Sequence, residues 1–183
     1  MGKKNKKVKN NKLPDKKIKS VLKPSKSESL SFDFTYKNWL KTVKIKGEFI
    51  NKLKDKDEYI NYITHCLYNL LPFIQENWSD IKVNSSNSYQ FPHCHILIGE
   101  KKQLALKIIE MIHEKKIFDE EDDYNLWQFG NKEGLRLIGA HDYQNEVIYP
   151  LFIDYHHELY PSKYYNDKDL NKYNFCPVEN FET

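Results

Sequence analysis

The stretch YNLWQFGNKEGLRLIGAHDYQNEVIYPLFIDYHHELYP, residues 124–161, decides the fold, because three strand patterns follow one another in it between tight turns. The first is the apolar run of residues 126–129, which ends at a glycine and an asparagine. The second is centred on residues 135–138 and leads to a turn at residues 142–145. The third, residues 147–155, is the longest β-branched and aromatic run in the chain and is therefore predicted to be a central strand.

Arg136 is the residue of this stretch that points most clearly to chemistry. Strand alternation places it on the face opposite its neighbours Leu135 and Leu137. It is also the only arginine in the protein, against 28 lysines. His141 follows it, and residues 154–157, with the sequence Asp-Tyr-His-His, come at the end of the next predicted strand. We therefore expect a candidate site near Arg136.

A long helix is predicted upstream of the three strands. It is expected to begin at Asp55 or Asp57, because acidic side chains favour the first turn of a helix. Apolar residues then recur at spacings of three and four as far as Trp78, which gives one apolar stripe. Pro72 lies inside this pattern and should kink the helix or divide it in two.

The segment FPHCHILIG, residues 91–99, carries His93 and His95 and ends at a glycine. A second helix is predicted over residues 101–116, where apolar residues mark one buried side. A short alternating run at residues 32–36 could add a strand. Together these elements predict an α+β fold in which a helical N-terminal half packs on a small antiparallel sheet.

Charge divides the chain into a basic arm and an acidic body. Residues 1–26 hold 11 lysines and one aspartate, a net charge of +10, whereas the rest of the chain carries −7. Residues 1–30 are therefore expected to be a disordered basic tail, and residues 31–183 a single α+β domain. The tail is either an electrostatic arm for RNA or the ribosome, or a solubilising segment without a specific partner. The candidate RNA-binding residues are Lys3, Lys4, Lys6 and Lys7.

Cysteine usage and hydropathy indicate where the protein acts. The three cysteines are widely spaced and form no C-x-x-C, which argues against a disulfide scaffold or a zinc ribbon and favours a reducing cytosol. No apolar stretch approaches the roughly 18 residues of a membrane helix, and the N-terminus has no apolar signal core. A cytoplasmic protein without a membrane partner is expected.

One interpretation of the histidines is a metal site. Two histidines at positions i and i+2 of an extended segment point the same way and can share a metal. An aspartate and a histidine after the last strand could complete the coordination. The set would be His93, His95, Asp154 and His157.

A second interpretation is RNA cleavage without metal or other cofactor. Attack by the 2′-hydroxyl needs a base, a cation that stabilises the phosphate charge, and an acid for the leaving oxygen. Arg136 would hold the phosphate, because its planar fork matches two phosphate oxygens. His157, His141 or Tyr160 could transfer protons. The structural alternative is that Arg136 pairs with Asp154 and that His157 caps a turn.

The order of these elements resembles the C-terminal half of RelE/ParE/HigB-type toxins. In that family an arginine-bearing strand precedes an apolar strand that ends in a histidine and tyrosine segment. Here Arg136-Leu137-Ile138-Gly139 is followed by an apolar strand and then by Asp154, His157 and Tyr160, so the resemblance covers roughly residues 93–161. The chain is similar, more closely, to an uncharacterised group of bacterial proteins with an H-x-H segment, an arginine-bearing strand and a terminal D-x-x-H-x-x-Y-P.

The toxin resemblance implies a RelE-like sheet and either mRNA cleavage on the ribosome or, for ParE-like members, inhibition of gyrase. Arg136 matches the strand arginine of that family, His157 its terminal histidine and Tyr160 its terminal tyrosine. The acidic body and the helical N-terminal half depart from the small, strongly basic toxins. Either the protein has become a binding module, or the basic tail replaces the missing surface charge.

These observations lead to one main hypothesis and two alternatives. The main hypothesis is a toxin-like or phage-defence endoribonuclease that uses Arg136, His157, Tyr160 and His141 without metal, with an antitoxin or other protein as a possible partner. The first alternative is a non-catalytic interaction or regulatory protein on the same fold. The second is a metal-dependent hydrolase.

Overall fold

The computed structural model describes residues 30–83, 90–118, 124–131, 134–161 and 169–181. The strands are β1 (Ser31–Phe32), β2 (Lys44–Ile45), β3 (Phe49–Ile50), β4 (His95–Ile96), β5 (Asn125–Gly130), β6 (Arg136–Asp142) and β7 (Val147–Asp154). The helices are α1 (Lys56–His65), α2 (Leu71–Val83), α3 (Gly99–His113) and α4 (Pro177–Phe181), with a π-helical turn η2 (Cys66–Leu70) and 3-10 turns η1 (Lys37–Leu40) and η3 (Leu170–Lys172). The predicted basic tail lies, apart from Leu30, outside the described residues, as do Lys3, Lys4, Lys6 and Lys7.

Within the described residues, five strands form one sheet in the order β1-β7-β6-β5-β4. The three strands predicted between residues 124 and 161 are confirmed as β5, β6 and β7, and they pair antiparallel in sequence order. β7 is an interior strand as expected, although β6 holds the middle position. The sheet is not wholly antiparallel, because β1 pairs parallel with β7, Ser31 lying opposite Val147. A tight hairpin cannot make a parallel pair, but the long connection through the helices can.

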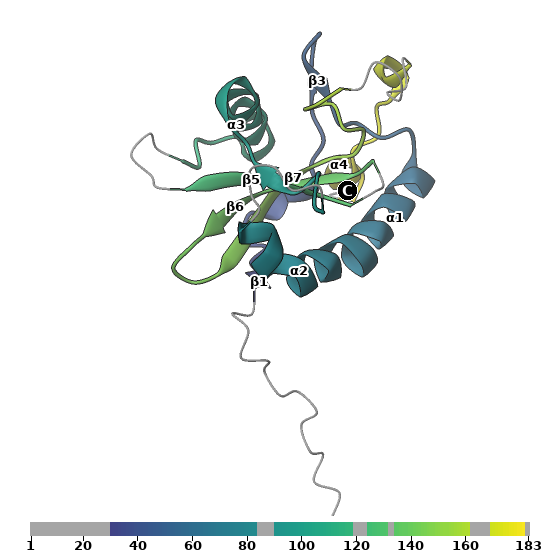
Figure 1. Cartoon of the computed structure of the whole chain (residues 1–183). Helices are drawn as coiled ribbons and strands as arrows, with labels where there is room; N and C mark the ends of the chain where they lie inside the picture. Colours follow the sequence, from purple (N-terminus) through teal and green to yellow (C-terminus); the bar gives the residue numbers. More distant parts are fainter. Residues whose placement is uncertain (1–29, 84–89, 119–123, 132–133, 162–168, 182–183) are drawn as a thin grey trace, which may run out of the picture.

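Helices cover both faces of this sheet (Figure 1). α1, η2 and α2 lie on one face, where Ile74 and Trp78 pack with Trp127 and Leu137 in one apolar core. α3 lies on the other face, where its buried side packs with Ile138, Phe152 and their neighbours in a second core. The fold is therefore a mixed α/β arrangement of three layers, and side chains of one strand alternate between two different environments.

The predicted long helix is divided just before Pro72. α1 begins as expected, with the Asp55 carboxylate accepting the N–H of Glu58 at 2.9 Å as a cap. The π-helical turn η2 separates α1 from α2, and the N–H of Leu71 bonds to the carbonyl of Cys66. A proline ring clashes with the carbonyl four residues earlier and has no N–H to donate. The wider turn ahead of Pro72 accommodates both constraints.

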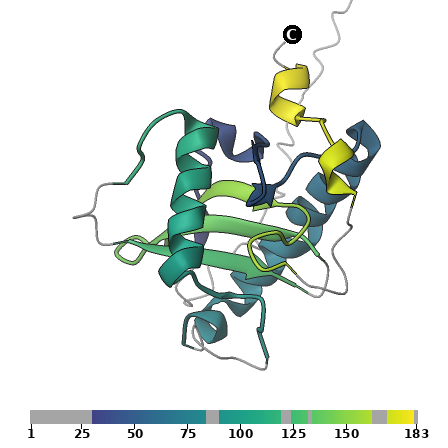
Figure 2. The same ribbon diagram turned by 90° about the horizontal axis from the view of Figure 1, so that it is seen from above.

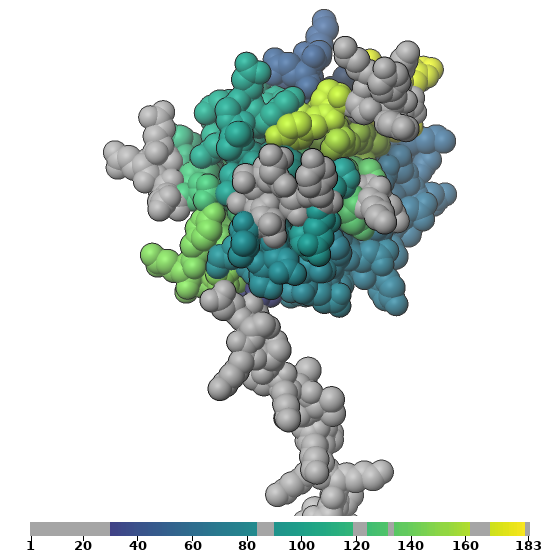
Figure 3. Space-filling model, viewed as in Figure 1, coloured from purple at the N-terminus to yellow at the C-terminus, as the bar shows by residue number. Residues whose placement is uncertain are grey.

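The segment that follows β7, residues 155–161, lies on the same face of the sheet as α3 and beside it (Figure 2). In the space-filling view it reaches the molecular surface next to α3 (Figure 3). The C-terminal part packs back on the body as predicted, since Leu53 and Phe175 exchange backbone hydrogen bonds of 3.0 and 2.9 Å. In the described residues no helix combines the length and apolar character that crossing a bilayer requires.

Candidate active site

Four rings from two segments that are far apart in the sequence come together on the α3 face of the sheet. His93 precedes β4, His95 begins it, and His157 and Tyr160 belong to the segment after β7. The ring centroids of His93 and His157 are 6.4 Å apart, those of His157 and Tyr160 6.4 Å, and those of His95 and Tyr160 5.4 Å. All four side chains are half-buried. We refer to these four residues as the histidine cluster.

Asp154 shapes the turn that presents His157. Its carboxylate accepts the N–H groups of Glu158 and Leu159 at 2.9 and 2.8 Å, immediately after β7 ends. His157 itself has a left-handed backbone with φ of 62°, a conformation that a non-glycine residue adopts only when its surroundings hold it there. Burial raises the pKa of Asp154 to about 6, although the two N–H groups lower it by favouring the charged form. The capping role in this turn therefore falls to Asp154.

Arg136 is more deeply buried than the cluster and, besides their own burial, its charge contributes to the lowered pKa of His93, His95 and His157. It stands opposite Gly130 on one side and opposite Asp154 on the other. A Cβ at Gly130 would be 2.5 Å from the Cδ of Arg136, so only glycine leaves room for this side chain. The guanidinium donates through Nη1 to the carbonyl of Leu135 at 2.9 Å, and Arg136 is 4% exposed. It acts on the cluster as a buried positive charge rather than as an open phosphate fork.

The three imidazoles are held in their neutral form. Burial, followed by the charges of Arg136, His93 and His95, lowers the pKa of His157 to about 4. Burial and Arg136 also lower the pKa of His93, and burial is the largest cause of the lowered pKa of His95. A neutral imidazole keeps a nitrogen lone pair that can accept a proton in the course of a reaction. Burial raises the pKa of Tyr160, which keeps its hydroxyl protonated.

The contacts of His95 define its tautomer, whereas the ring nitrogens of His93 and His157 are available to a ligand. The buried amide of Gln128 approaches the Nε2 of His95 at 3.1 Å, and the Nδ1 of His95 lies 3.3 Å from the carbonyl of Ile96. A hydrogen on Nδ1 satisfies both contacts, since Nε2 then accepts from Gln128. Within the described part of the chain, no hydrogen bond occupies the ring nitrogens of His93 or His157. These two are the groups free to exchange protons with a ligand.

A model of the family described as "Uncharacterised protein UU032" matches residues 35–183, which include every residue of this cluster. The chain belongs to this family. A protein of Ureaplasma parvum serovar 3 (strain ATCC 700970), described as "Uncharacterized protein UU032", is 28% identical over 177 residues, which cover 96% of this chain and 95% of the relative. No solved structure matches the chain. The expected membership of an uncharacterised family is therefore confirmed.

His141, which sequence analysis grouped with Arg136, lies elsewhere in this UU032-family chain. It stands at the other end of β6, on the α2 face, and its Nε2 lies 3.0 Å from a carboxylate oxygen of Glu146. Glu146 also accepts the indole N–H of Trp78 at 2.8 Å and the ammonium group of Lys82. We refer to Trp78, Lys82, His141 and Glu146 as the Glu146 network.

The residues proposed for a metal site do not form one ligand group. His93, His95 and His157 meet in the cluster, but both oxygens of Asp154 are bonded to the turn. Among the described residues, no three His, Cys, Asp or Glu side chains are placed to hold a metal ion. The structure thus brings together three of the four residues predicted for a metal site, but they do not complete a coordination sphere.

Two residues of the site were missed by sequence analysis. Gln128 is a polar residue between apolar neighbours in β5, and this alternation is the signal that could have identified it. The ammonium group of Lys101, in the first turn of α3, lies 5.2 Å from the ring centroid of Tyr160. No pattern in the sequence marks Lys101 among 28 lysines, because only the packing of α3 beside the segment after β7 brings it to the cluster.

Proposed function

We propose that this protein is an RNA-directed, metal-independent endoribonuclease whose centre is the histidine cluster. The observation that carries the proposal is the meeting of two neutral imidazoles, His93 and His157, with a protonated tyrosine and two cations. Cleavage of RNA through its 2′-hydroxyl needs a base, an acid and positive charge, and the cluster offers all three.

The roles follow from the protonation states. His157 or His93 accepts the proton of the 2′-hydroxyl as its oxygen forms a bond to phosphorus, and the bond from phosphorus to the 5′-oxygen breaks. Tyr160 gives its proton to that leaving oxygen and recovers it afterwards through the imidazoles. The products are a 2′,3′-cyclic phosphate and a 5′-hydroxyl. Lys101 provides charge at the surface, while Arg136 acts from a buried position through its field.

The basic arm supports RNA as the substrate class. Residues 1–26 carry a net charge of +10, and each lysine that contacts a phosphate releases counterions and adds salt-sensitive affinity. In this proposal Lys3, Lys4, Lys6 and Lys7 draw RNA or the ribosome toward a body that is itself acidic. The resemblance of residues 93–161 to RelE-type toxins supports the same assignment, and implies an antitoxin-like partner in the cytoplasm.

The test uses the full chain and a labelled single-stranded RNA in the presence of a chelator. We expect slow cleavage with a 2′,3′-cyclic phosphate end, detected by mass spectrometry, and no cleavage of the DNA of the same sequence. His157→Gln and His93→Gln should each lose the activity. His65→Gln, which changes a histidine on α1, is the matched control. An intact RNA after incubation with the folded wild-type protein would overturn the proposal.

A second candidate, a non-catalytic RNA-binding or protein-binding module, is favoured by the position of Arg136. Its guanidinium donates to backbone carbonyls of Leu135 and Asn131 instead of facing outward. In this case the wild-type chain would retain RNA, or a protein partner, without producing new RNA ends. The cleavage assay above separates the two candidates when a filter-binding measurement is made on the same samples.

A further inference from the structure

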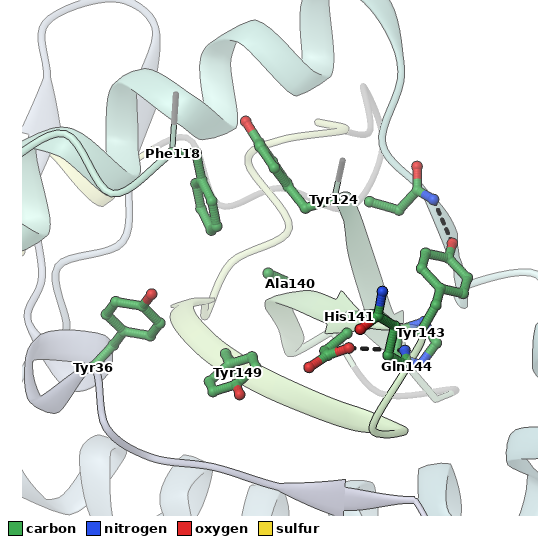
Figure 4. A pocket seen from close by; sticks show the side chains of 10 residues that line it. Tyr36, Phe118, Tyr124, Ala140, His141, Tyr143, Gln144 and Tyr149 are labelled. Atoms are coloured by element: carbon green, nitrogen blue, oxygen red, sulfur yellow. Dashed lines mark hydrogen bonds between the residues drawn. The ribbon is translucent and has the colours of Figure 1, made fainter. Parts of the chain in front are cut away.

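A hollow lies away from the histidine cluster, at the end of the sheet where β6 turns into β7 (Figure 4). Its volume is about 590 Å³. Aromatic side chains from several segments of the chain line it, together with one carboxylate. These rings belong to Tyr36, Phe118, Tyr124, Tyr143 and Tyr149, and the carboxylate belongs to Asp142. The close-up shows the rings arranged around the hollow from several sides rather than as one flat platform (Figure 4).

The rings are held in place by one another and by their neighbours. Phe118 and Tyr124 stack with ring centroids 4.0 Å apart, and Tyr36 meets Tyr149 edge to face at 6.0 Å. The hydroxyl of Tyr143 accepts a hydrogen bond from the side-chain amide of Asn125. A ligand would therefore meet aromatic faces and edges whose orientation is already set, which reduces the entropy lost on binding.

The charge of the lining selects the kind of ligand. Asp142 accepts the N–H of Gln144 and the side-chain amide of Asn145, and these hydrogen bonds lower its pKa, so that it is ionised at neutral pH. No lysine or arginine lines the hollow among the described residues. At its rim the ammonium group of Lys102 lies 4.9 Å from the ring centroid of Tyr124. An anionic ligand would find one lysine at the rim but a carboxylate in the lining that repels it, whereas a cation finds that carboxylate and electron-rich ring faces.

We propose that this hollow binds a small organic cation that carries an alkylated ammonium group. The aromatic rings enclose the alkyl groups and attract the charge through their quadrupoles, and Asp142 supplies the opposite charge at the edge. Rings placed on several sides fit a compact, rounded cation better than a flat base, which would stack on a single ring. The site is separate from the histidine cluster and does not depend on RNA cleavage.

The test compares choline with 3,3-dimethyl-1-butanol, a neutral molecule of the same shape, by calorimetric titration of the full chain. Choline should bind saturably, and the neutral analogue about tenfold more weakly or less, because it lacks the charge. Equal binding of both molecules, or no binding of choline, would overturn the proposal. Preferential binding of adenosine monophosphate would also overturn it and would indicate a base-stacking site instead.

Variants locate the binding in this hollow. Tyr149→Leu removes a lining ring and should weaken choline binding about tenfold, whereas Tyr149→Phe keeps the ring and should bind like the wild type. Asp142→Asn should also weaken binding. Tyr68→Leu, at an 80% exposed tyrosine of η2, is the matched control. Far-ultraviolet circular dichroism confirms folding in each case, and choline binding that survives in folded Tyr149→Leu and Asp142→Asn would exclude this site.

Discussion

The histidine cluster and the Glu146 network lie toward opposite ends of β6, and each places histidine beside charged groups: three imidazoles in the cluster, one in the network. In the network, His141 has a side chain with no exposure and lies 3.0 Å from a carboxylate oxygen that also binds a tryptophan and a lysine. In the cluster, His93 and His157 are half-buried, and no described residue binds their ring nitrogens. A buried imidazole whose Nε2 is bonded to a carboxylate serves stability, whereas accessible imidazoles with unoccupied nitrogens can serve chemistry.

The largest expected difference between the cluster and the network is the effect of a histidine substitution on RNA cleavage. His157→Gln should lower the cleavage rate by about 10²–10⁴-fold, the range that a general base contributes. The same change should leave the melting temperature nearly unchanged. His141→Gln should do the opposite, with reduced stability and full activity per folded molecule. Single-turnover cleavage and thermal melting of both variants make the measurement, and equal loss of activity in the two would erase the distinction.

The next effect concerns the stability supplied by the network. Glu146→Ala should lower the free energy of unfolding by about 2–3 kcal/mol, because it leaves the indole N–H of Trp78 and the imidazole of His141 buried without their acceptor. The control is Glu48→Ala, which breaks a surface ion pair with Lys107 and should cost less than about 1 kcal/mol. Urea unfolding compares the two, and similar losses would show that the network adds nothing to an ordinary ion pair.

A smaller effect tests whether the charge of Arg136 supports the cluster. Gly130→Ala places a methyl group 2.5 Å from the Cδ of Arg136, so the guanidinium must move, at a cost of about 1–2 kcal/mol in unfolding free energy. Displacing this charge should also raise the pKa of His157 above its value of about 4. Proton NMR titration of the imidazoles follows that pKa. An unchanged titration in a destabilised variant would mean that Arg136 has a structural role alone.

How much of the fold could be predicted from the sequence depends on how far apart in the chain the interacting residues are. The strands of residues 124–161, the start of the first helix at Asp55 and its division near Pro72 follow from local patterns and were predicted. The parallel pairing of β1 with β7 depends on contacts between distant segments, whereas alternation over the five residues from Arg136 already places His141 on the opposite face. Alternation divides the side chains of β6 between the two faces of the sheet, but it does not say which helices cover each face.

The same limit applies to the candidate site. The sequence singled out His93, His95, His157 and Tyr160 as residues capable of chemistry, but only the fold brings them within ring contact. The part played by Asp154 was also beyond sequence reasoning, because a carboxylate after a strand can pair with an arginine, bind a metal or cap a turn. Here two backbone N–H groups decide among these roles.

The smallest effect is the dependence of stability on pH, and it has opposite signs for two residues of the site. His157 has a folded pKa of about 4, below its ordinary value of 6.5, so the unfolded chain takes up its proton first and stability is lost as the pH falls below 6.5. Asp154 has a folded pKa of about 6, above 3.8, so its contribution favours the folded state at low pH and is lost as the pH rises from 3.8 through 6.

The two contributions oppose each other at pH 5, and single variants separate them. Relative to its own stability at pH 7, His157→Gln should lose less on acidification to pH 5 than the wild type, and Asp154→Asn should lose more. The difference for His157 is on the order of 1 kcal/mol, because solvent at this half-buried ring screens the charges of Arg136, His93 and His95. Urea unfolding at both pH values makes the comparison. If His157→Gln follows the wild-type profile, the imidazole is not held neutral in the folded protein, and the cluster loses the property that sets it apart from an ordinary surface histidine.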